Sequence, residues 1–399
     1  MNSDHAMTAV RTPVLETKLP AVGTTIFTVM SALATEHKAV NLGQGFPDFG
    51  CDPALIDAVS DAMREGLNQY PSMLGVLELR QAIAAEMQQR HGAGIGVERI
   101  AVTSGGVNAL MLAMQAIVNP ADEVVVVTPV WPNLTSQPVI LGADLRTVCL
   151  EPQHGRWTLP MEKLLAAITP HTRLVVINSP NNPTGWTLSR AEQQTILAHC
   201  RRTDTWILSD EVYENLYYLP TENRCAPSFL DFAAPLDRLV VAHSFSKSFL
   251  MTGWRLGWLV MPVDMTEHMG KLIEFNTSCA SVFVQRAGVA AMQRAGDIVP
   301  QVVMQMQACR DRLFVELGSI PGLDLAVPDG GMYAFFSIPG LTDDVQTAKR
   351  LVAEAGLGLA PGSAFSPEAR GWLRWCFASQ DPNRLGEGAR RLKSWLGKL

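Results

Sequence analysis

The most informative run in the chain is Ser244-Phe245-Ser246-Lys247-Ser248-Phe249-Leu250-Met251-Thr252-Gly253-Trp254-Arg255-Leu256-Gly257. It sets one lysine, Lys247, between a hydroxyl group upstream at Ser244 and a guanidinium downstream at Arg255. Hydroxyl and guanidinium groups both donate hydrogen bonds to phosphate, and arginine adds a permanent charge in a forked geometry. The run therefore predicts an anion site beside a reactive amine, although Ser, Lys and Gly are also common in ordinary loops.

Short apolar strands flank this run and recur before it. Leu239–Ser244 leads into it, Gly257–Met261 leads out of it, and four more candidate strands precede them: Ile100–Thr103, Val124–Thr128, Leu174–Asn178 and Trp206–Asp210. Several are apolar throughout, as expected for strands covered on both faces. Candidate helices lie between them, including Val107–Val118 and Ser189–Arg201, and a capping-box pattern marks the start of the second. Alternating strands and helices predict an α/β fold with a doubly wound, mostly parallel sheet.

The sequence changes character after about Arg286. Helical patterns dominate there, followed by two further candidate strands, Met332–Ser337 and Trp372–Ala378. We therefore expect three parts: an N-terminal arm with part of a small domain at 1–44, a large domain at 45–285 that carries the anion site, and a C-terminal small domain at 286–399. No internal repeat or low-complexity linker interrupts them.

Composition and charge exclude several classes of protein. The chain has 399 residues, a net charge of −6 and 47% hydrophobic residues, which is typical of a globular protein and gives no indication of nucleic-acid binding. No run of about 20 apolar residues predicts a membrane span, and Met1 to Pro20 lacks the pattern of a signal peptide. The seven cysteines are scattered and without Cys-x-x-Cys spacing. We expect reduced thiols, no metal site and a cytoplasmic protein.

A second anion-binding element is expected at residues 103 to 110, Thr-Ser-Gly-Gly-Val-Asn-Ala-Leu, which follow a strand and open a helix. Gly105 and Gly106 let the backbone approach an anion closely. The free N–H groups at the helix N-terminus, around Val107, favour negative charge. Alone, this pattern is typical of any strand–helix turn. Together with Ser244 and Arg255 it predicts a phosphate site.

An amine beside a phosphate site suggests a covalent imine between Lys247 and an aldehyde cofactor that carries a phosphate, and pyridoxal 5′-phosphate (PLP) is that cofactor. Asp210 ends a candidate strand, where open α/β sheets place ligands, and its carboxylate can keep a pyridine nitrogen protonated. Tyr213, three residues on, can donate a hydrogen bond to the phenolate oxygen of the ring. Trp131 follows another strand and can stack on the ring, although a lone tryptophan is more often part of a core.

Arg374 is the most unusual charge in the sequence, since it lies in the apolar run Trp372-Leu373-Arg374-Trp375-Cys376-Phe377-Ala378. A buried arginine without a partner is costly, so the run predicts either an anionic ligand or an ion pair with an Asp or Glu of the same chain. Three further motifs, each of which alone also fits a turn, are Asn178-Ser179-Pro180-Asn181-Asn182-Pro183-Thr184-Gly185, Asn41-Leu42-Gly43-Gln44-Gly45-Phe46-Pro47-Asp48 and Asn68-Gln69-Tyr70.

Together these motifs resemble those of the class I/II aminotransferases of PLP fold type I, in the same order and over nearly the whole chain. The resemblance implies roles for the remaining residues. Asn182 would reach the phenolate oxygen of the cofactor and the substrate carboxylate. Arg374 would clamp the α-carboxylate with two parallel hydrogen bonds, and Gly45 would offer a backbone contact beside it. Tyr70 would reach the phosphate of a neighbouring subunit, which requires a homodimer.

The branch of the family is marked less clearly. The segment from Gly23 to Asp48 resembles the methionine/kynurenine-type branch, whereas Arg255 and Trp131 are more typical of aspartate-type members. Gly106-Val107 replaces the Ala-Thr that is common in the family, so the backbone contacts survive without the threonine hydroxyl. We expect the enzyme to transfer the α-amino group of a neutral or hydrophobic L-amino acid, such as methionine, an aromatic amino acid or glutamine, to a 2-oxo acid.

Three alternatives stay open. An aspartate aminotransferase needs a second cation for the side-chain carboxylate, and Arg286 is the candidate. A PLP lyase or decarboxylase on the same fold would use most of the same residues. A non-enzymatic regulator would carry a basic DNA-binding segment before the aminotransferase-like domain, and we expect residues 1–22 to be too short for one.

Overall fold

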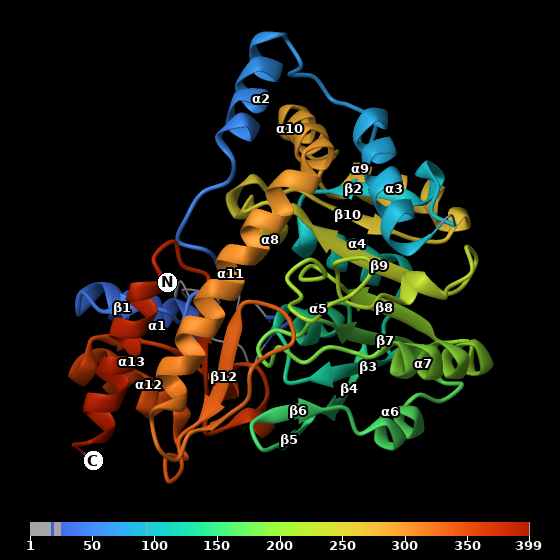
Figure 1. Ribbon diagram of the computed structural model, residues 1–399. Coiled ribbons are helices and arrows are strands. Elements are labelled where there is room, and N and C mark those ends of the chain that lie inside the picture. The colour runs from blue at the N-terminus through green and yellow to red at the C-terminus, as the bar shows by residue number, and fades with distance from the viewer. Residues whose placement is uncertain (1–16, 20–24, 93, 399) are drawn as a thin grey trace, which may run out of the picture.

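The computed structural model describes residues 17–19, 25–92 and 94–398 (Figure 1). The expected absence of a signal peptide concerns residues 1–20, which lie mostly outside this range, and it stays a prediction. Gly23 and Thr24 of the N-terminal segment lie outside it as well.

A seven-stranded sheet forms the centre of the larger part of the molecule. In spatial order its strands are β2 (Ile100–Thr103), β10 (Gly257–Val260), β9 (Leu239–Ser244), β8 (Trp206–Asp210), β7 (Thr172–Asn178), β3 (Glu123–Thr128) and β4 (Asp144–Cys149). Neighbouring strands are parallel except for β10, which runs antiparallel to both β2 and β9. The predicted α/β fold with a mostly parallel sheet is confirmed.

Apart from the edge strand β4, the strands of this sheet are buried on both faces, which explains why they are largely apolar. In β3, Val124 and Val126 face one apolar core, and Val125 and Val127 face another. One face is covered by α4 (Gly106–Ile117), α5 (Asn133–Ile140) and α9 (Thr266–Asn276). The other is covered by α3 (Leu77–His91), α6 (Met161–Ala167), α7 (Arg190–Thr203) and α10 (Val282–Gln293).

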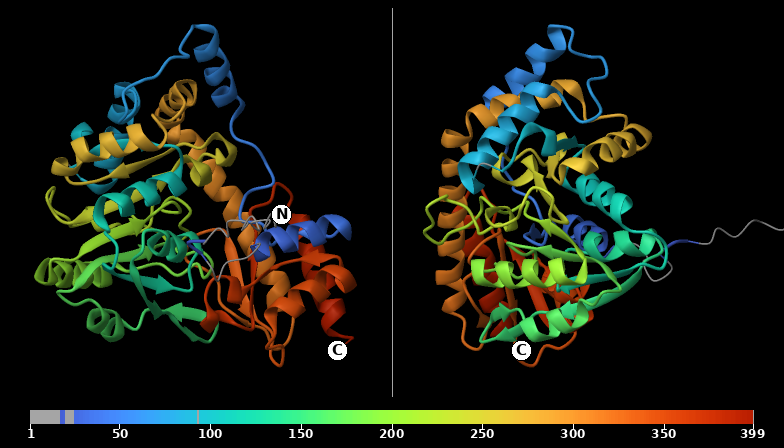
Figure 2. Two further views of the ribbon diagram at one scale, coloured as in Figure 1. Left: turned by 180° about the vertical axis from the view of Figure 1, so that it is seen from behind. Right: turned by 90° about the vertical axis from the view of Figure 1, so that its right-hand side faces the viewer.

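A smaller sheet has the order β11 (Asp324–Leu325), β12 (Tyr333–Ser337), β15 (Trp372–Cys376) and β14 (Ala360–Pro361). Around it lie α1 (Ile26–Glu36), α12 (Asp344–Ala355) and α13 (Pro382–Leu396), and the long helix α11 (Ala295–Gly318) connects the two parts (Figure 1). Strand β1 (Val40–Asn41) pairs with β13 (Leu357–Gly358), so the N-terminal segment lies against the C-terminal part (Figure 2). The expected domain boundaries at residues 45 and 286 stay a prediction.

The remaining elements are peripheral to these two sheets. Helix α2 (Pro53–Arg64) packs against α10 at one end of the molecule, and α8 (Phe245–Ser248) is a single turn. A small hairpin joins β5 (Glu151–Gln153) to β6 (Arg156–Thr158). Within the described residues no helix is both long and apolar enough to cross a membrane. All seven cysteines lie in these residues and none forms a disulfide, as expected.

Candidate active site

A cavity of about 360 Å³ opens at the carboxyl ends of the parallel strands. The last residues of the parallel strands β7, β8 and β9 lie at one edge of the sheet. Asn178, at the end of β7, pairs with Asp210, at the end of β8, and Ser244, at the end of β9, pairs with Gly257, at the start of β10. The smaller sheet and the N-terminal segment close the other side. Most of the residues predicted for the site line this one cavity: Gly45, Gly106, Val107, Trp131, Asn182, Asp210, Tyr213, Ser244, Lys247, Arg255 and Arg374.

Hydrogen-bond donors gather at the anion end of the cavity. Gly105 has φ +89°, which disfavours any side chain, and a Cβ atom there would lie 2.3 Å from an Arg255 guanidinium nitrogen and would push this arginine aside. Arg255 is held by the Thr252 carbonyl oxygen at 2.7 Å. Ser244 accepts a hydrogen bond from the Ser246 backbone N–H at 3.1 Å, which brings both hydroxyl groups to the same corner. This donor set fits a phosphate group.

Lys247 and Asp210 occupy the middle of the cavity. Burial lowers the pKa of Lys247 to about 8, which favours the uncharged amine that attacks an aldehyde. The Lys247 Nζ lies 3.3 Å from the Gly45 carbonyl oxygen. Burial raises the pKa of Asp210 to about 7, against the opposing effects of the Val212 N–H and the charge of Lys247. A protonated pyridine nitrogen beside Asp210 would restore its negative charge, so both residues fit PLP.

Arg374 has a surrounding that suits a missing anion. It is 3% exposed and donates to the Asn182 side-chain oxygen at 2.9 Å and to the Gly43 carbonyl oxygen at 2.7 Å, while its Nε–H is buried without a partner. Rings of Phe27, Phe365 and Tyr333 surround the guanidinium at 4.5 to 5.4 Å. Across the described part of the chain Arg374 forms no ion pair with an acidic side chain, so the alternative of an intramolecular pair is wrong there.

Tyr333 and Ser246 are residues of the cavity that the sequence reasoning missed. Tyr333 begins β12, and its hydroxyl lies 2.9 Å from that of Tyr213. The available signal was a single hydroxyl group in the otherwise apolar run Met332–Phe336. Ser246 stands inside the quoted lysine run, where a second hydroxyl next to the lysine was the signal.

Tyr70 lies outside the cavity of its own chain. It is 80% exposed and lines a separate hollow, together with Gln69 and Arg286. The structure therefore does not bring Tyr70 to the other predicted residues within one subunit.

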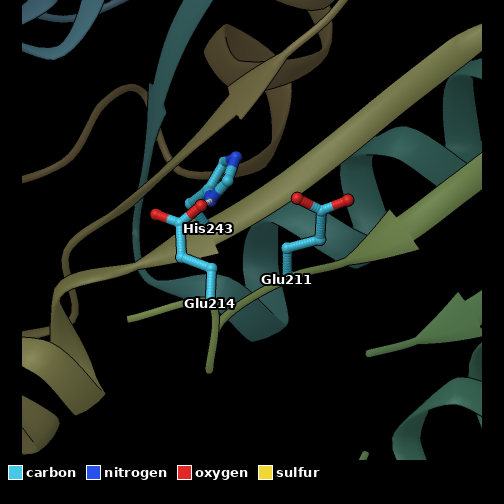
Figure 3. A group of neighbouring side chains, drawn as sticks. All are labelled: Glu211, Glu214 and His243. Atoms are coloured by element: carbon cyan, nitrogen blue, oxygen red, sulfur yellow. Dashed lines mark ion pairs between the residues drawn. The ribbon is translucent and has the colours of Figure 1, made fainter. Parts of the chain in front are cut away.

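A buried charged cluster lies next to the site, on the loop after β8 and on β9. Figure 3 shows the Glu214 carboxylate against the ring of His243, with Glu211 beside them. These residue types can hold a metal, but Glu214 already lies 3.5 Å from His243, 3.6 Å from His91 and 3.7 Å from Arg90. Although burial opposes them, these three basic groups keep the pKa of Glu214 well below its usual value. The cluster thus balances its charge internally, and the expectation of no metal stays a prediction.

Comparison with known proteins identifies the family. A family model described as aminotransferase class I and II matches residues 37–392. An aspartate aminotransferase of Musicola paradisiaca is 31% identical over 348 residues, 86% of either chain. A methionine aminotransferase of Escherichia coli is 30% identical over 380 residues, 94% of this chain and 97% of its own.

The same relationship is seen among solved structures. A methionine aminotransferase from Escherichia coli has a TM-score of 0.90 at 29% identity, over 96% of this chain and 100% of that one. The alternatives of a lyase and of a non-enzymatic regulator find no support among these relatives. The chain belongs to the class I and II aminotransferases of PLP fold type I, and it is a PLP-dependent transaminase.

Proposed function

We propose that this transaminase takes a neutral, mainly apolar L-amino acid as donor, such as methionine, an aromatic amino acid or glutamine, and a 2-oxo acid as acceptor. The wall of the cavity carries this proposal. Its three basic side chains are Lys247, Arg255 and Arg374, which we assign to the cofactor and to the α-carboxylate of the substrate. The rest of the wall is largely apolar, with Phe27, Phe46, Val107, Leu110 and Trp131. An apolar substrate side chain gains free energy when such a wall removes it from water. A carboxylate on the side chain of the substrate would find no further basic side chain among the described residues that line the cavity.

The residues at the anion end and the middle of the cavity would hold the cofactor. Ser244, Ser246, Arg255 and the N-terminus of α4 would bind its phosphate, and Trp131 would stack on its ring. Asp210 would keep the ring nitrogen protonated, and Tyr213 and Asn182 would donate to the ring oxygen. When bound, PLP supplies the electron sink for the charge that develops at the substrate α-carbon.

Lys247 would both bind the cofactor and move the proton. Displaced by the substrate amine, its Nζ would take the proton from the α-carbon and return it to the cofactor carbon C4′, acting in turn as general base and general acid. Burial suits this role, because it brings the pKa of Lys247 to about 8, close to neutral pH. Arg374, assisted by Asn182 and the backbone of Gly45, would hold the α-carboxylate and so orient the α-proton toward Lys247.

We also propose a homodimer in which Tyr70 reaches the phosphate bound by the partner subunit. Its support is the exposure of Tyr70 outside its own cavity, and the exposed apolar residues that precede and follow it in the sequence, Ile56 and Met63 of α2 and Leu77 of α3. Sedimentation velocity should show a dimer, and Ile56→Glu with Met63→Glu should give an inactive monomer. Val315→Glu, at an exposed position of α11, is the control that should stay dimeric. An active monomer of the unaltered protein would contradict the proposal.

Aspartate is the second candidate donor, favoured by the position of Arg286. This arginine shares a surface hollow with Tyr70, so a dimer that brings Tyr70 to the partner's cavity would bring Arg286 near it too. Against this, Arg286 pairs with Glu78 at 3.1 Å, which neutralises its charge.

Specificity constants decide between the two donors. We expect kcat/KM for methionine, phenylalanine or glutamine to exceed that for aspartate with the same 2-oxo acid, and Arg286→Gln to leave methionine use unchanged. A tenfold preference for aspartate, about 1.4 kcal/mol of transition-state binding, that Arg286→Gln abolishes would establish the second candidate instead.

A further inference from the structure

Two buried tyrosines share a hydrogen bond at the meeting point of the two sheets. Tyr213 follows β8 of the large sheet, and Tyr333 begins β12 of the small one. Their hydroxyl oxygens lie 2.9 Å apart, and their rings pack edge to face with centroids 5.9 Å apart. Tyr213 is 4% exposed and Tyr333 is 1% exposed. Burial raises the pKa of both phenols above the usual value, so each hydroxyl keeps its proton at neutral pH.

The hydrogen bond between the two hydroxyl groups can run in either direction. In the first arrangement, Tyr213 donates to Tyr333, whose own proton can go to the Gly45 carbonyl oxygen, 3.4 Å away and already faced by Lys247. That distance is long for a hydrogen bond between a hydroxyl and a carbonyl. In the second, Tyr333 donates to Tyr213 at 2.9 Å, and the proton of Tyr213 turns toward the cavity. A charged acceptor in the cavity favours the second arrangement, because charge-assisted hydrogen bonds are the stronger ones.

We propose that Tyr333 is a positioning residue, whose hydroxyl donates to the Tyr213 oxygen and so directs the proton of Tyr213 onto the ring oxygen of the bound cofactor. The inference rests on the proposed position of Tyr213 beside that oxygen. A donor behind Tyr213 also polarises its O–H group and strengthens the bond in front of it.

The neighbours of Tyr333 indicate how the hydroxyl can be tested apart from the ring. The ring lies 4.5 Å from the Arg374 guanidinium and stacks edge to face on Tyr213. Phenylalanine keeps both of these contacts. Tyr333→Phe therefore removes the hydrogen bond to Tyr213 and leaves the carboxylate clamp in place.

The test is the pH titration of the visible absorbance of the cofactor-loaded enzyme. With weaker donation from Tyr213, the ring oxygen becomes more basic and the bound cofactor keeps its proton to higher pH. We expect Tyr333→Phe to raise the titration midpoint by about 0.4 to 1 pH unit, the effect of one neutral hydrogen bond, and Tyr213→Phe to raise it more. Tyr218→Phe is the control, since it removes a partly buried tyrosine hydroxyl that donates to the Gly331 carbonyl oxygen outside the cavity, and it should leave the midpoint unchanged.

The double variant separates the inference from the function on which it rests. If Tyr333 acts through Tyr213, adding Tyr333→Phe to Tyr213→Phe shifts the midpoint no further. Additive shifts, or a change in KM alone, would overturn the inference. No shift from Tyr213→Phe would instead refute the proposed position of Tyr213. If Tyr333→Phe does not fold, 3-fluorotyrosine at position 333 serves as the second variant: it makes a stronger donor, so the midpoint should fall, and a rise or no change would overturn the inference.

Discussion

The basic side chains of Lys247 and Arg374 lie in the same cavity, an arrangement that costs free energy when no anion is bound. Burial, and to a lesser degree the nearby charge of Arg374, lower the pKa of Lys247 to about 8 from the usual value of 10.5. The same surroundings leave the Nε–H of Arg374 without a partner. The proposed ligands would relieve both costs, because a covalent bond would remove the charge of Lys247 and a carboxylate would complete the hydrogen bonds of Arg374.

At the residue scale, the first prediction concerns Lys247. Lys247→Ala should remove the visible absorbance of covalently bound PLP and lower turnover by orders of magnitude, because both the attachment point and the general base are lost. Lys271→Ala, an exposed lysine paired with Glu267, should change neither. A Lys247→Ala enzyme with normal spectrum and turnover would refute the assignment.

The second prediction uses the pKa of the same lysine. Only the uncharged amine attacks the aldehyde, so the rate at which the apoenzyme takes up PLP should rise tenfold for each pH unit below about 8 and level off above it. Stopped-flow absorbance at several pH values measures this. A rate that keeps rising to pH 10 would show an ordinary, solvated lysine.

The third prediction concerns the carboxylate clamp. Arg374→Lys should lower kcat/KM for amino acids by about a hundredfold or more, since an ammonium group cannot reproduce two parallel hydrogen bonds. The affinity for PLP should stay nearly unchanged. Simple amines without a carboxylate provide the comparison, and an equal loss with them would mean that Arg374 acts only on the fold.

At the scale of elements, the sequence located the strands that carry the site better than those that do not. The bounds of β2, β8 and β9 agree with the prediction because these strands are buried on both faces and each ends in a polar residue. Strand β4 was missed, since it lies at the sheet edge and carries exposed Asp144 and Thr147. Tyr333 was missed because only the tertiary packing of two sheets brings it to Tyr213.

The fourth prediction belongs to the turn between β2 and α4. Gly105→Ala should weaken PLP binding at least tenfold, because φ +89° disfavours any side chain and the added Cβ would displace Arg255 from the proposed phosphate site. Gly296→Ala is the control, since a Cβ there meets nothing within 4 Å. Fluorescence titration of the apoenzymes with PLP compares the two, and equal affinities would contradict the role of this turn.

At the scale of the whole molecule, the buried charged cluster links stability to pH. Burial alone would lower the pKa of His91, but the hydrogen bond with Asp231 at 2.7 Å and the negative charge of Glu214, 3.6 Å away, outweigh it and raise the pKa to about 9. Because the pKa of His91 in the folded protein exceeds the usual 6.5, these interactions increase the free energy of unfolding. This contribution to stability is complete below about pH 6.5 and is lost as the pH rises through about 9. Its upper size is roughly 3 kcal/mol.

The fifth prediction follows from this linkage. The difference in unfolding free energy between the cofactor-loaded enzyme and its His91→Gln variant should be largest near pH 6 and shrink toward pH 9.5. Denaturant unfolding at a series of pH values measures it. His171→Gln, which alters an exposed histidine, should show no such trend, and a pH-independent difference for His91→Gln would contradict the raised pKa.

The contact between Arg374 and the Gly43 carbonyl oxygen spans 331 residues of chain, and this has a consequence for biosynthesis. At 5 to 20 residues per second, the ribosome makes the two partners roughly 17 to 66 seconds apart. Gly105 and Arg255, which belong to the proposed phosphate site, are synthesised well before Arg374. During translation the residues proposed to hold the cofactor phosphate therefore exist well before Arg374, and the proposed carboxylate clamp can be completed only after the ribosome has made β15, the last strand of the small sheet.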